Sequence, residues 1–249
     1  MPLSLLRAGR RPAVLLPDTV EIAGRAVPLR LNRHPLAKRL TLRLKDGGIA
    51  VTAPPRASSA SVLDFVERHR GWIAARLDRA APTLVVEPGA VLPFRGGELT
   101  LVHRPDRRGT AFQEIDGASH LVVGGGLEHF SRRVADALKR AARSDLQAAV
   151  DRHAATVGLK PKALALKDTT SRWGSCTADR RLAFSWRIVM APPAVLDYLA
   201  AHEVAHFRQM NHGADFWALC RELCPGTPAG RAWLKANGAS LHAIDFGAK

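Results

Sequence analysis

Apolar and polar residues alternate along the first part of the chain. Between residues 19 and 52, the runs VEIAG, RAVPLRL and KRLTLRLK place apolar side chains at every second position. This period of two is typical of strands with one buried face. The DGG run at residues 46–48 predicts a tight turn, so the strands on its two sides are expected to form a hairpin.

A helical period follows the predicted hairpin. From Ser58 onward, apolar residues recur at the three-to-four spacing, which predicts one amphipathic helix over residues 58–80. Short strands are expected next in TLVVEP, LPFRGGELTLVHRP and SHLVVGGG, where Gly and Pro separate the apolar runs. No internal repeat is visible in the sequence.

The second half of the chain predicts a long helix and then two strands. The long helix covers about residues 127–157, and the strands lie on either side of a turn near Ala178 and Asp179. The second strand is expected to run through Met190, because apolar residues occupy every second position of its sequence.

Pro192 and Pro193 mark the start of the next helix, since proline suits the first helical turn. This helix is expected to extend to about Met210, and two shorter helices, DFWALCREL and AGRAWLKAN, follow it. The order of strands and helices predicts an α+β fold.

Three glycines at residues 124–126 suggest a domain boundary. We expect a flexible N-terminal tail at 1–17, a β-rich N-terminal part at 18–125 and a C-terminal domain at 126–249. No GK[ST] run follows the glycines, so a linker is favoured over a phosphate-binding loop.

Charge narrows the choice of partners. Lys and Arg number 37 against 22 acidic residues, a formal net charge of +15. Such a field attracts anions, so a nucleic acid, a nucleotide or simply a basic surface would explain it. The basic residues concentrate in residues 25–45, which contain no acid, and a solvated strand face accounts for them equally well. DNA association through this basic surface is an open expectation.

Cysteine usage and hydropathy point to a cytoplasmic protein with no membrane partner. The three cysteines, Cys176, Cys220 and Cys224, are an odd number in a chain without an export signal, so reduced thiols are expected. The longest apolar runs are far too short to cross a bilayer.

The stretch AHEVAHFRQMNHG, residues 201–213, carries the candidate chemistry. Residues four apart project from the same side of a helix, so His202 and His206 can hold one metal ion between them. Glu203 projects beside the pair, where it could accept a proton from a metal-activated water. This H-E-x-x-H pattern is typical of zinc metallopeptidases, and a chance match among ordinary histidines is the alternative.

His212 completes the predicted ligand set. It lies six residues after His206, so the helix must end near Met210 and the chain must turn back, which Asn211 favours because it tolerates the left-handed conformation. Three histidines leave one coordination position open, as hydrolysis requires, and imidazole ligands favour one zinc ion per chain. Metzincins share this spacing, but here Gln209 replaces their glycine and no later methionine follows.

Five runs carry a family resemblance: SRWGSCT (171–177), FSWRIVMAP (184–192), LDYLAAHEVAH (196–206), NHGADFW (211–217) and WLKANG (233–238). Together they resemble the YgjP-like metallopeptidase family, bacterial proteins related to the SprT-like and WLM zinc proteases. The resemblance is specific over about residues 163–241, and LPFRGGELTL resembles the family's upstream part. It implies a zincin-type core, with a mixed sheet beside the active-site helix. It also implies His202, His206 and His212 as zinc ligands and Glu203 as the base.

Four residues near these motifs are candidate substrate contacts. An upstream strand in zincins commonly pairs with an extended substrate, and FSWRIVM occupies that place in the sequence. Arg172 and Arg187 could bind a carboxylate or a phosphate, although Arg187 is equally well explained as an exposed strand residue. Trp173 shares an irregular, glycine-containing turn with Arg172. Tyr198 lies one turn before His202, where it either stabilises a tetrahedral intermediate or packs in the core.

Two classes of enzyme remain. The leading hypothesis is a zinc-dependent metallopeptidase that hydrolyses peptide bonds of a protein or peptide substrate, with Glu203 as general base. The alternative is a metal-dependent nucleotide (UTP) pyrophosphatase at the same site, because some family members are described as acting on UTP. The chain has no P-loop and no acidic cluster for Mg²⁺, which counts against it. A metal-stabilised DNA-binding module is disfavoured, because Glu203 would then have no purpose.

Overall fold

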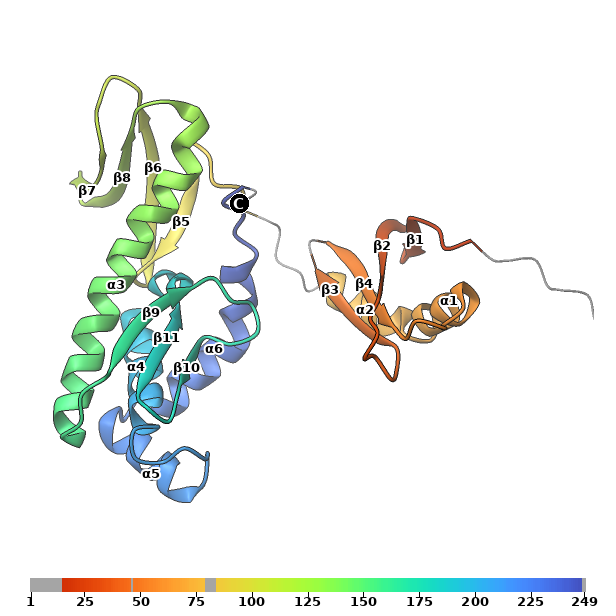
Figure 1. The fold of residues 1–249 in the computed structure, drawn as a ribbon. Coiled ribbons are helices and arrows are strands. Elements are labelled where there is room, and N and C mark those ends of the chain that lie inside the picture. The colour runs from red at the N-terminus through yellow and green to blue at the C-terminus, as the bar shows by residue number, and fades with distance from the viewer. Residues whose placement is uncertain (1–14, 46, 79–83, 248–249) are drawn as a thin grey trace, which may run out of the picture. The chain divides into compact units, whose positions relative to one another are not determined.

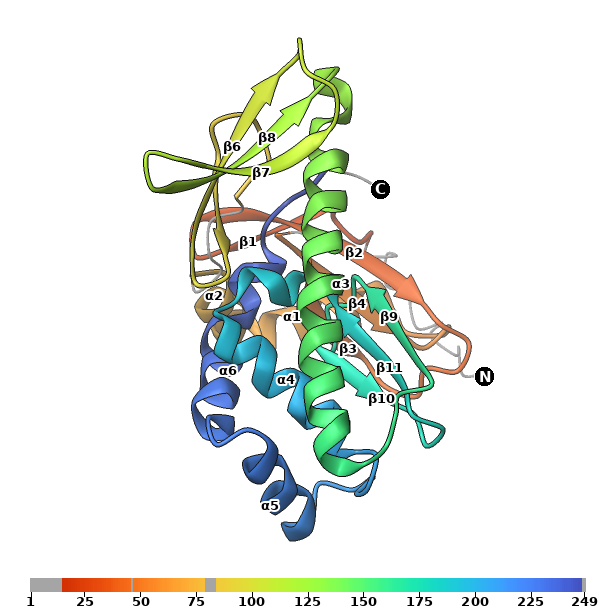
Figure 2. The same cartoon turned by 90° about the vertical axis from the view of Figure 1, so that its left-hand side faces the viewer.

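The computed structural model describes residues 15–45, 47–78 and 84–247, which form an α+β fold (Figures 1 and 2). The chain divides into two compact units, Met1–Ala80 and Ala81–Lys249. The boundary predicted at residues 124–126 lies inside the second unit, where the preceding strand and the following helix share one core. Residues 1–14 of the expected tail lie outside the described residues.

Four strands form the sheet of the first unit: β1 (Thr19–Ile22), β2 (Arg25–Arg33), β3 (Thr41–Lys45) and β4 (Gly48–Ala53). Their order is β1-β2-β4-β3, with β2 and β4 parallel and the other neighbours antiparallel. The predicted hairpin is confirmed as β3 and β4, and Asp46 of its turn lies outside the described residues.

Two helices, α1 (Ser59–Arg68) and α2 (Arg70–Asp78), replace the single helix predicted over residues 58–80. Helix α1 ends at Arg68, because the next residue, His69, has φ of −101° and ψ of 6° and leaves the helical region. The neighbouring Gly71 further weakens helix continuation. One face of the sheet packs with these helices through a cluster of buried residues: Ile22, Val27, Leu29, Ile49, Val51, Ala53, Val62, Val66 and Ile73.

The other face of this sheet is open and basic. Arg30 and Arg43 both pair with Ala50, from the strands on its two sides, and both arginines are exposed. Residues 1–80 contain 15 Lys and Arg against 6 Asp and Glu, so they carry +9 of the formal charge of +15. The basic run at residues 25–45 therefore supplies an exposed strand face.

The second unit begins with another four-stranded sheet: β5 (Val91–Phe94), β6 (Gly97–Arg104), β7 (Thr110–Ile115) and β8 (Ala118–Gly124). Its order is β5-β6-β8-β7, with β6 and β8 parallel and the other neighbours antiparallel. The helical segment that follows comprises η1 (Leu127–His129) and α3 (Phe130–Val157) and agrees with the helix predicted over residues 127–157.

The two four-stranded sheets are copies of one module. Equivalent residues of the two copies differ by 72 in residue number, as Ile22 and Phe94 do. In both copies, each residue of the parallel strand pair faces a residue 20 positions later in the chain. Leu29 pairs with Ile49 in the first copy, and Leu101 pairs with Leu121 in the second. Buried residues coincide at this shift in the strands and in the next helix: Ile22 with Phe94, Val27 with Leu99, Leu29 with Leu101, Ile49 with Leu121, Val51 with Val123, Val62 with Val134, and Val66 with Leu138. The structure therefore contains an internal repeat, although none is visible in the sequence. The copies share apolar character and not residue identity, which hides the repeat in the sequence.

A mixed sheet follows α3: β9 (Ala163–Lys167), β10 (Gly174–Cys176) and β11 (Arg181–Ser185), in the order β10-β11-β9. This sheet and the sheet β5–β8 lie along different ends of α3 (Figures 1 and 2). The strand predicted through Met190 stops at Ser185 and continues as the 3₁₀ helix η2 (Trp186–Met190). Ile188, Val189 and Met190 are all buried there, which a strand with one buried face would not allow.

Three helices complete the unit: α4 (Pro193–Ala205), α5 (Ala214–Leu223) and α6 (Thr227–His242). Helix α4 is central, because it contacts α3, α5, α6, η2 and β10. Cys176, Cys220 and Cys224 are free thiols. None of the helices in the described residues combines the length and apolar character needed to span a membrane.

A charged network joins α3 to α4. Asp197 Oδ1 accepts hydrogen bonds from Arg152 Nη2 at 2.6 Å and from His153 Nε2 at 2.7 Å. Burial raises the pKa of Asp197, but the hydrogen bonds and charges of His153 and Arg152 outweigh it, so the pKa is lowered. A lowered folded-state pKa stabilises the fold above the unfolded-state pKa and loses this effect as the pH falls through the folded value.

We expect Asp197→Asn to lower the free energy of unfolding by about 1.5–3 kcal/mol near neutral pH, because the buried His153 loses its charged partner and the exposed Arg152 loses its ion pair. The difference should shrink in acid, where the wild type loses the same charge. Chemical denaturation at neutral and acidic pH measures both effects. Asp136→Asn is the control, since its pairs with Arg132 and Lys139 are exposed and contribute less than about 1 kcal/mol. Equal losses in the two variants would contradict the prediction.

Candidate active site

Helix α4 presents the predicted active-site residues from a buried position. It begins at Pro193 with Pro192 as its N-cap residue, as predicted from the two prolines. Nine of its 13 residues are buried, including Glu203. Packing on several sides therefore fixes the directions in which its polar side chains project.

Helix α4 ends at Ala205 and not near Met210 as predicted. His206 follows directly and keeps helical dihedral angles, with φ of −63° and ψ of −15°. It therefore still projects from the same side as His202, one turn further along.

The chain turns back after His206 through backbone hydrogen bonds between residues that are two or three positions apart. The Phe207 N–H donates to the Val204 carbonyl at 2.9 Å, and the Gly213 N–H donates to the Asn211 carbonyl at 2.8 Å. Asn211 has no positive φ, so the predicted left-handed turn at this residue is wrong. The reversal nevertheless returns the chain to the helix end.

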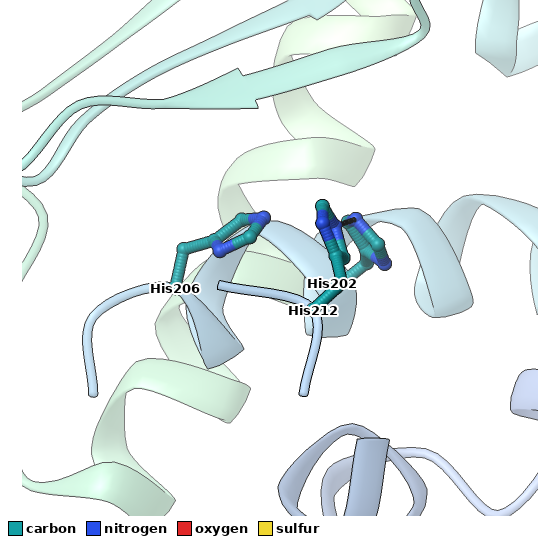
Figure 3. A group of neighbouring side chains, drawn as sticks. All are labelled: His202, His206 and His212. Atoms are coloured by element: carbon teal, nitrogen blue, oxygen red, sulfur yellow. Dashed lines mark hydrogen bonds between the residues drawn. The ribbon is translucent and has the colours of Figure 1, made fainter. Parts of the chain in front are cut away.

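The structure brings the three predicted histidines together (Figure 3). His202, His206 and His212 each offer a ring nitrogen, and these nitrogens lie within 4.8 Å of one another. The Nε2 atoms of His202 and His212 are 3.1 Å apart. Two nitrogens bound to one tetrahedral zinc ion lie about 3.3 Å apart, given zinc–nitrogen bonds of about 2.0–2.1 Å. The donor set, and the separation of His202 from His212, therefore fit a single ion.

Hydrogen bonding and burial prepare these imidazoles to bind a metal. His206 Nδ1 donates to the Gln209 carbonyl at 3.0 Å, which leaves Nε2 free to face an ion. Burial, with the charges of His206, His212 and Arg231, lowers the pKa of His202 to about 4. Burial also lowers the pKa of His206. Neutral imidazole is the form that binds metals.

Glu203 is a buried carboxyl with a free oxygen. Its residue is 4% exposed, and Oε2 has no hydrogen-bond partner among the described residues. Burial raises the pKa of Glu203 to about 8, against the opposing effect of the positive charge of Arg172. A carboxyl that exchanges its proton near neutral pH suits general acid–base chemistry.

Strand β10 meets Glu203 at a residue without a side chain. A Cβ atom at Gly174 would overlap Glu203 Oε1 and lie 2.8 Å from both Cδ and Cγ of Glu203. Glycine is therefore required for β10 to lie this close to α4. Sequence reasoning noted only a glycine-containing turn here, because the contact joins residues that are distant in sequence.

Strand β10 is an edge of its sheet within the described residues. The Trp173 carbonyl, just before β10, accepts a hydrogen bond from the Ser185 N–H at 2.8 Å. Because successive residues of an antiparallel strand face alternate sides, Gly174 and Cys176 direct their backbone groups toward the open edge. The predicted substrate strand, FSWRIVM, instead forms the last two residues of the central strand β11 and the whole of η2.

Arg172 and Trp173 have different surroundings. Arg172 is exposed, no described residue accepts a hydrogen bond from its guanidinium, and its charge acts on Glu203. Trp173 is half-buried, and its ring stacks on His242 with the centroids 4.4 Å apart. It also lies against Gly238 of α6. Trp173 therefore fastens the loop before β10 to α6, while Arg172 stays available to a ligand.

Tyr198 is a buried neighbour of His202. It is 6% exposed, clusters with Phe216 and Cys220, and its ring centroid lies 5.9 Å from that of His202. Burial raises its pKa to about 12. These contacts favour the core-packing interpretation over stabilisation of an intermediate.

Arg187 is engaged within the protein. It donates to Asp168 at 2.7 Å and to the carbonyls of Leu241 and Ile244 at 3.0 and 2.9 Å. Its side chain is 11% exposed. Arg187 thus binds the carboxyl end of α6, and the structure favours this role over the predicted substrate contact.

Sequence reasoning did not link Arg231 to the site. Its guanidinium lies 4.7 Å above the ring of Trp217, and this ring lies 5.7 Å from the rings of His202 and His212. Gly230 allows this placement, since a Cβ atom there would lie 2.6 Å from that of Tyr198. No short-range motif connects Arg231 with the histidines, so only the fold reveals their proximity.

A comparison with protein families agrees with this geometry. The family described as YgjP-like, metallopeptidase domain, matches residues 38–237. The chain belongs to this family. The YgjP-like match contains the whole histidine group and Glu203, and it begins within the first unit. No curated protein and no solved structure matches the chain.

We expect Gly174→Ala to destabilise this YgjP-like domain by about 1–3 kcal/mol, because the new methyl group overlaps the Glu203 carboxylate. In a Glu203→Ala background the same substitution should cost much less, since its clash partner is gone. A double-mutant cycle measured by chemical denaturation gives this coupling. Ser175→Ala on the same strand is the control and should show no coupling. Independent effects of Gly174→Ala and Glu203→Ala would contradict the close approach.

Proposed function

We propose that the protein is a zinc-dependent metallopeptidase, with His202, His206 and His212 as ligands of one zinc ion and Glu203 as general base. The convergence of three imidazoles beside a buried carboxyl with a free oxygen carries this proposal. When bound, the ion supplies Lewis acidity that polarises a carbonyl and acidifies water. Three histidine donors favour zinc and leave a coordination position open.

Glu203 moves the proton in this mechanism. Its free Oε2 takes a proton from the attacking water and then delivers it to the departing amine. Burial of Glu203 favours the protonated carboxyl, so the side chain can hold the proton between these two steps. Gly174 and the buried face of α4 keep the carboxyl in one orientation throughout.

The open edge of β10 suits an extended peptide. Backbone groups of Gly174 and Cys176 can pair with a substrate strand, as in strand addition at a sheet edge. Because Gly174 touches Glu203, a peptide bound to this edge runs next to the base. This arrangement supports a peptide or protein substrate over a small molecule.

We expect Glu203→Gln to bind one zinc ion per chain and to lose proteolytic activity by about 10²–10⁴-fold, because the amide cannot accept the proton. His202→Ala should lose the ion itself. Metal content by mass spectrometry and cleavage of an unfolded protein such as reduced casein give the two readouts.

His153→Gln is the control for these variants, since His153 lies in the network of α3 and not among the three histidines. It should keep both zinc and activity after correction for stability. Full proteolysis by Glu203→Gln, or by protein stripped of metal with a chelator, would refute the mechanism.

Nucleotide pyrophosphate hydrolysis is a second candidate, favoured by one observation. Arg172 and Arg231 are both exposed, and their charges act on Glu203 and His202 respectively. Guanidinium groups near a metal centre can bind the phosphates of a nucleoside triphosphate.

If this candidate is correct, zinc-loaded protein releases pyrophosphate from UTP, and Arg172→Gln and Arg231→Gln each raise KM about tenfold or more. Arg140→Gln is the matched control, because Arg140 is exposed on α3. A coupled pyrophosphate assay measures the rates. Absence of release by protein that carries zinc and cleaves casein would exclude UTP as the substrate.

A further inference from the structure

One face of the first sheet carries a basic row that has no side-chain partner among the described residues. Arg30, Ala50 and Arg43 lie side by side on β2, β4 and β3. Two strand spacings separate the arginine backbones, which is about 10 Å. Both arginines are exposed, and no described residue forms a hydrogen bond or ion pair with either side chain. Glu21, on the outer strand β1, is the one acidic residue within the four strands.

The second module shows that the fold does not require this charge. The shift of 72 residues places Val102 and Val122 at the positions of Arg30 and Ala50, and Ala111 pairs with Val122 as Arg43 pairs with Ala50. The equivalent row is therefore Val102, Val122 and Ala111. The two modules share strand order and core positions, so a sheet of this kind forms without arginine in the row. The row of the first unit is exposed at both arginines, whereas Val122 of the second is buried.

We propose that this face of the first unit binds the phosphate backbone of a nucleic acid. Lys38 and Arg39 are exposed in the loop between β2 and β3 and add two positive charges next to the sheet. Guanidinium forks match phosphate oxygens in geometry and charge. The surrounding unit carries +9, which steers a polyanion to it.

The composition of the face indicates backbone contact without base readout. The four strands contain no Phe, Tyr or Trp on which a base could stack. Contacts limited to phosphates fix position and carry no direct sequence information. An acidic peptide is less suited, because peptides join sheets at their edges, whereas this row crosses the strands of a face.

The test uses the full zinc-loaded chain and fluorescently labelled oligonucleotides of single-stranded DNA, duplex DNA and RNA, in salt titrations. The variant Arg30→Val with Arg43→Ala installs the residues that the second module has at these positions. We expect it to weaken binding about tenfold or more at low salt. The slope of log affinity against log salt should fall by about 2 for the duplex, since each lost phosphate contact removes about 0.9.

Two controls separate the face from total charge and from misfolding. Arg68→Gln with Arg70→Gln removes the same charge from α1 and α2 of the same unit and should leave affinity nearly unchanged. Arg30→Gln with Arg43→Gln should reproduce the loss with side chains of similar length, and thermal unfolding checks that each variant is folded.

Three results would overturn the proposal: no binding by the wild type at low salt, equal losses in the face and helix variants, or equal affinity for a poly-glutamate peptide. The last result would reassign the face to acidic proteins. The oligonucleotide that binds most tightly identifies the type of nucleic acid that this face prefers. Tight binding of single-stranded DNA, duplex DNA or RNA would each support the proposal.

Discussion

The close contact between Gly174 and Glu203 is the constraint on which the active site depends. It lets an edge strand lie directly on the helix that carries His202 and ends just before His206. The same contact excludes water from the carboxyl and so contributes to its raised pKa. Trp173 reinforces it by fastening the loop before β10 to α6. The position of the proposed base thus depends on a glycine, because a methyl group there would overlap its carboxylate.

Packing around α4 also fixes the positions of the candidate metal-binding histidines. Helices α3, α5 and α6 all contact it, and Asp197 fastens it to α3 through Arg152 and His153. His202 and His206 therefore project in fixed directions before any ion arrives. Such preorganisation limits the conformational entropy that metal binding must overcome.

Local spacing explains what could be predicted from the sequence. The approach of His202, Glu203 and His206 follows from helical periodicity, and the return of His212 follows from a required chain reversal. Contacts between distant segments, such as Gly174 with Glu203 or Arg231 with Trp217, leave no periodic signal. The strand predicted through Met190 failed for a related reason, because alternating apolar residues also occur in a 3₁₀ segment that is buried on more than one side.

The repeated module has a consequence for how the chain reaches its native state. Two sheets with the same strand order and the same pairing offset are competing templates, so a hairpin from one copy could pair with the other during folding. Differences in side-chain volume at matched core positions, such as Ile22 against Phe94, make hybrid sheets pack poorly. Divergence between the copies therefore acts as a safeguard against misassembly within a single molecule.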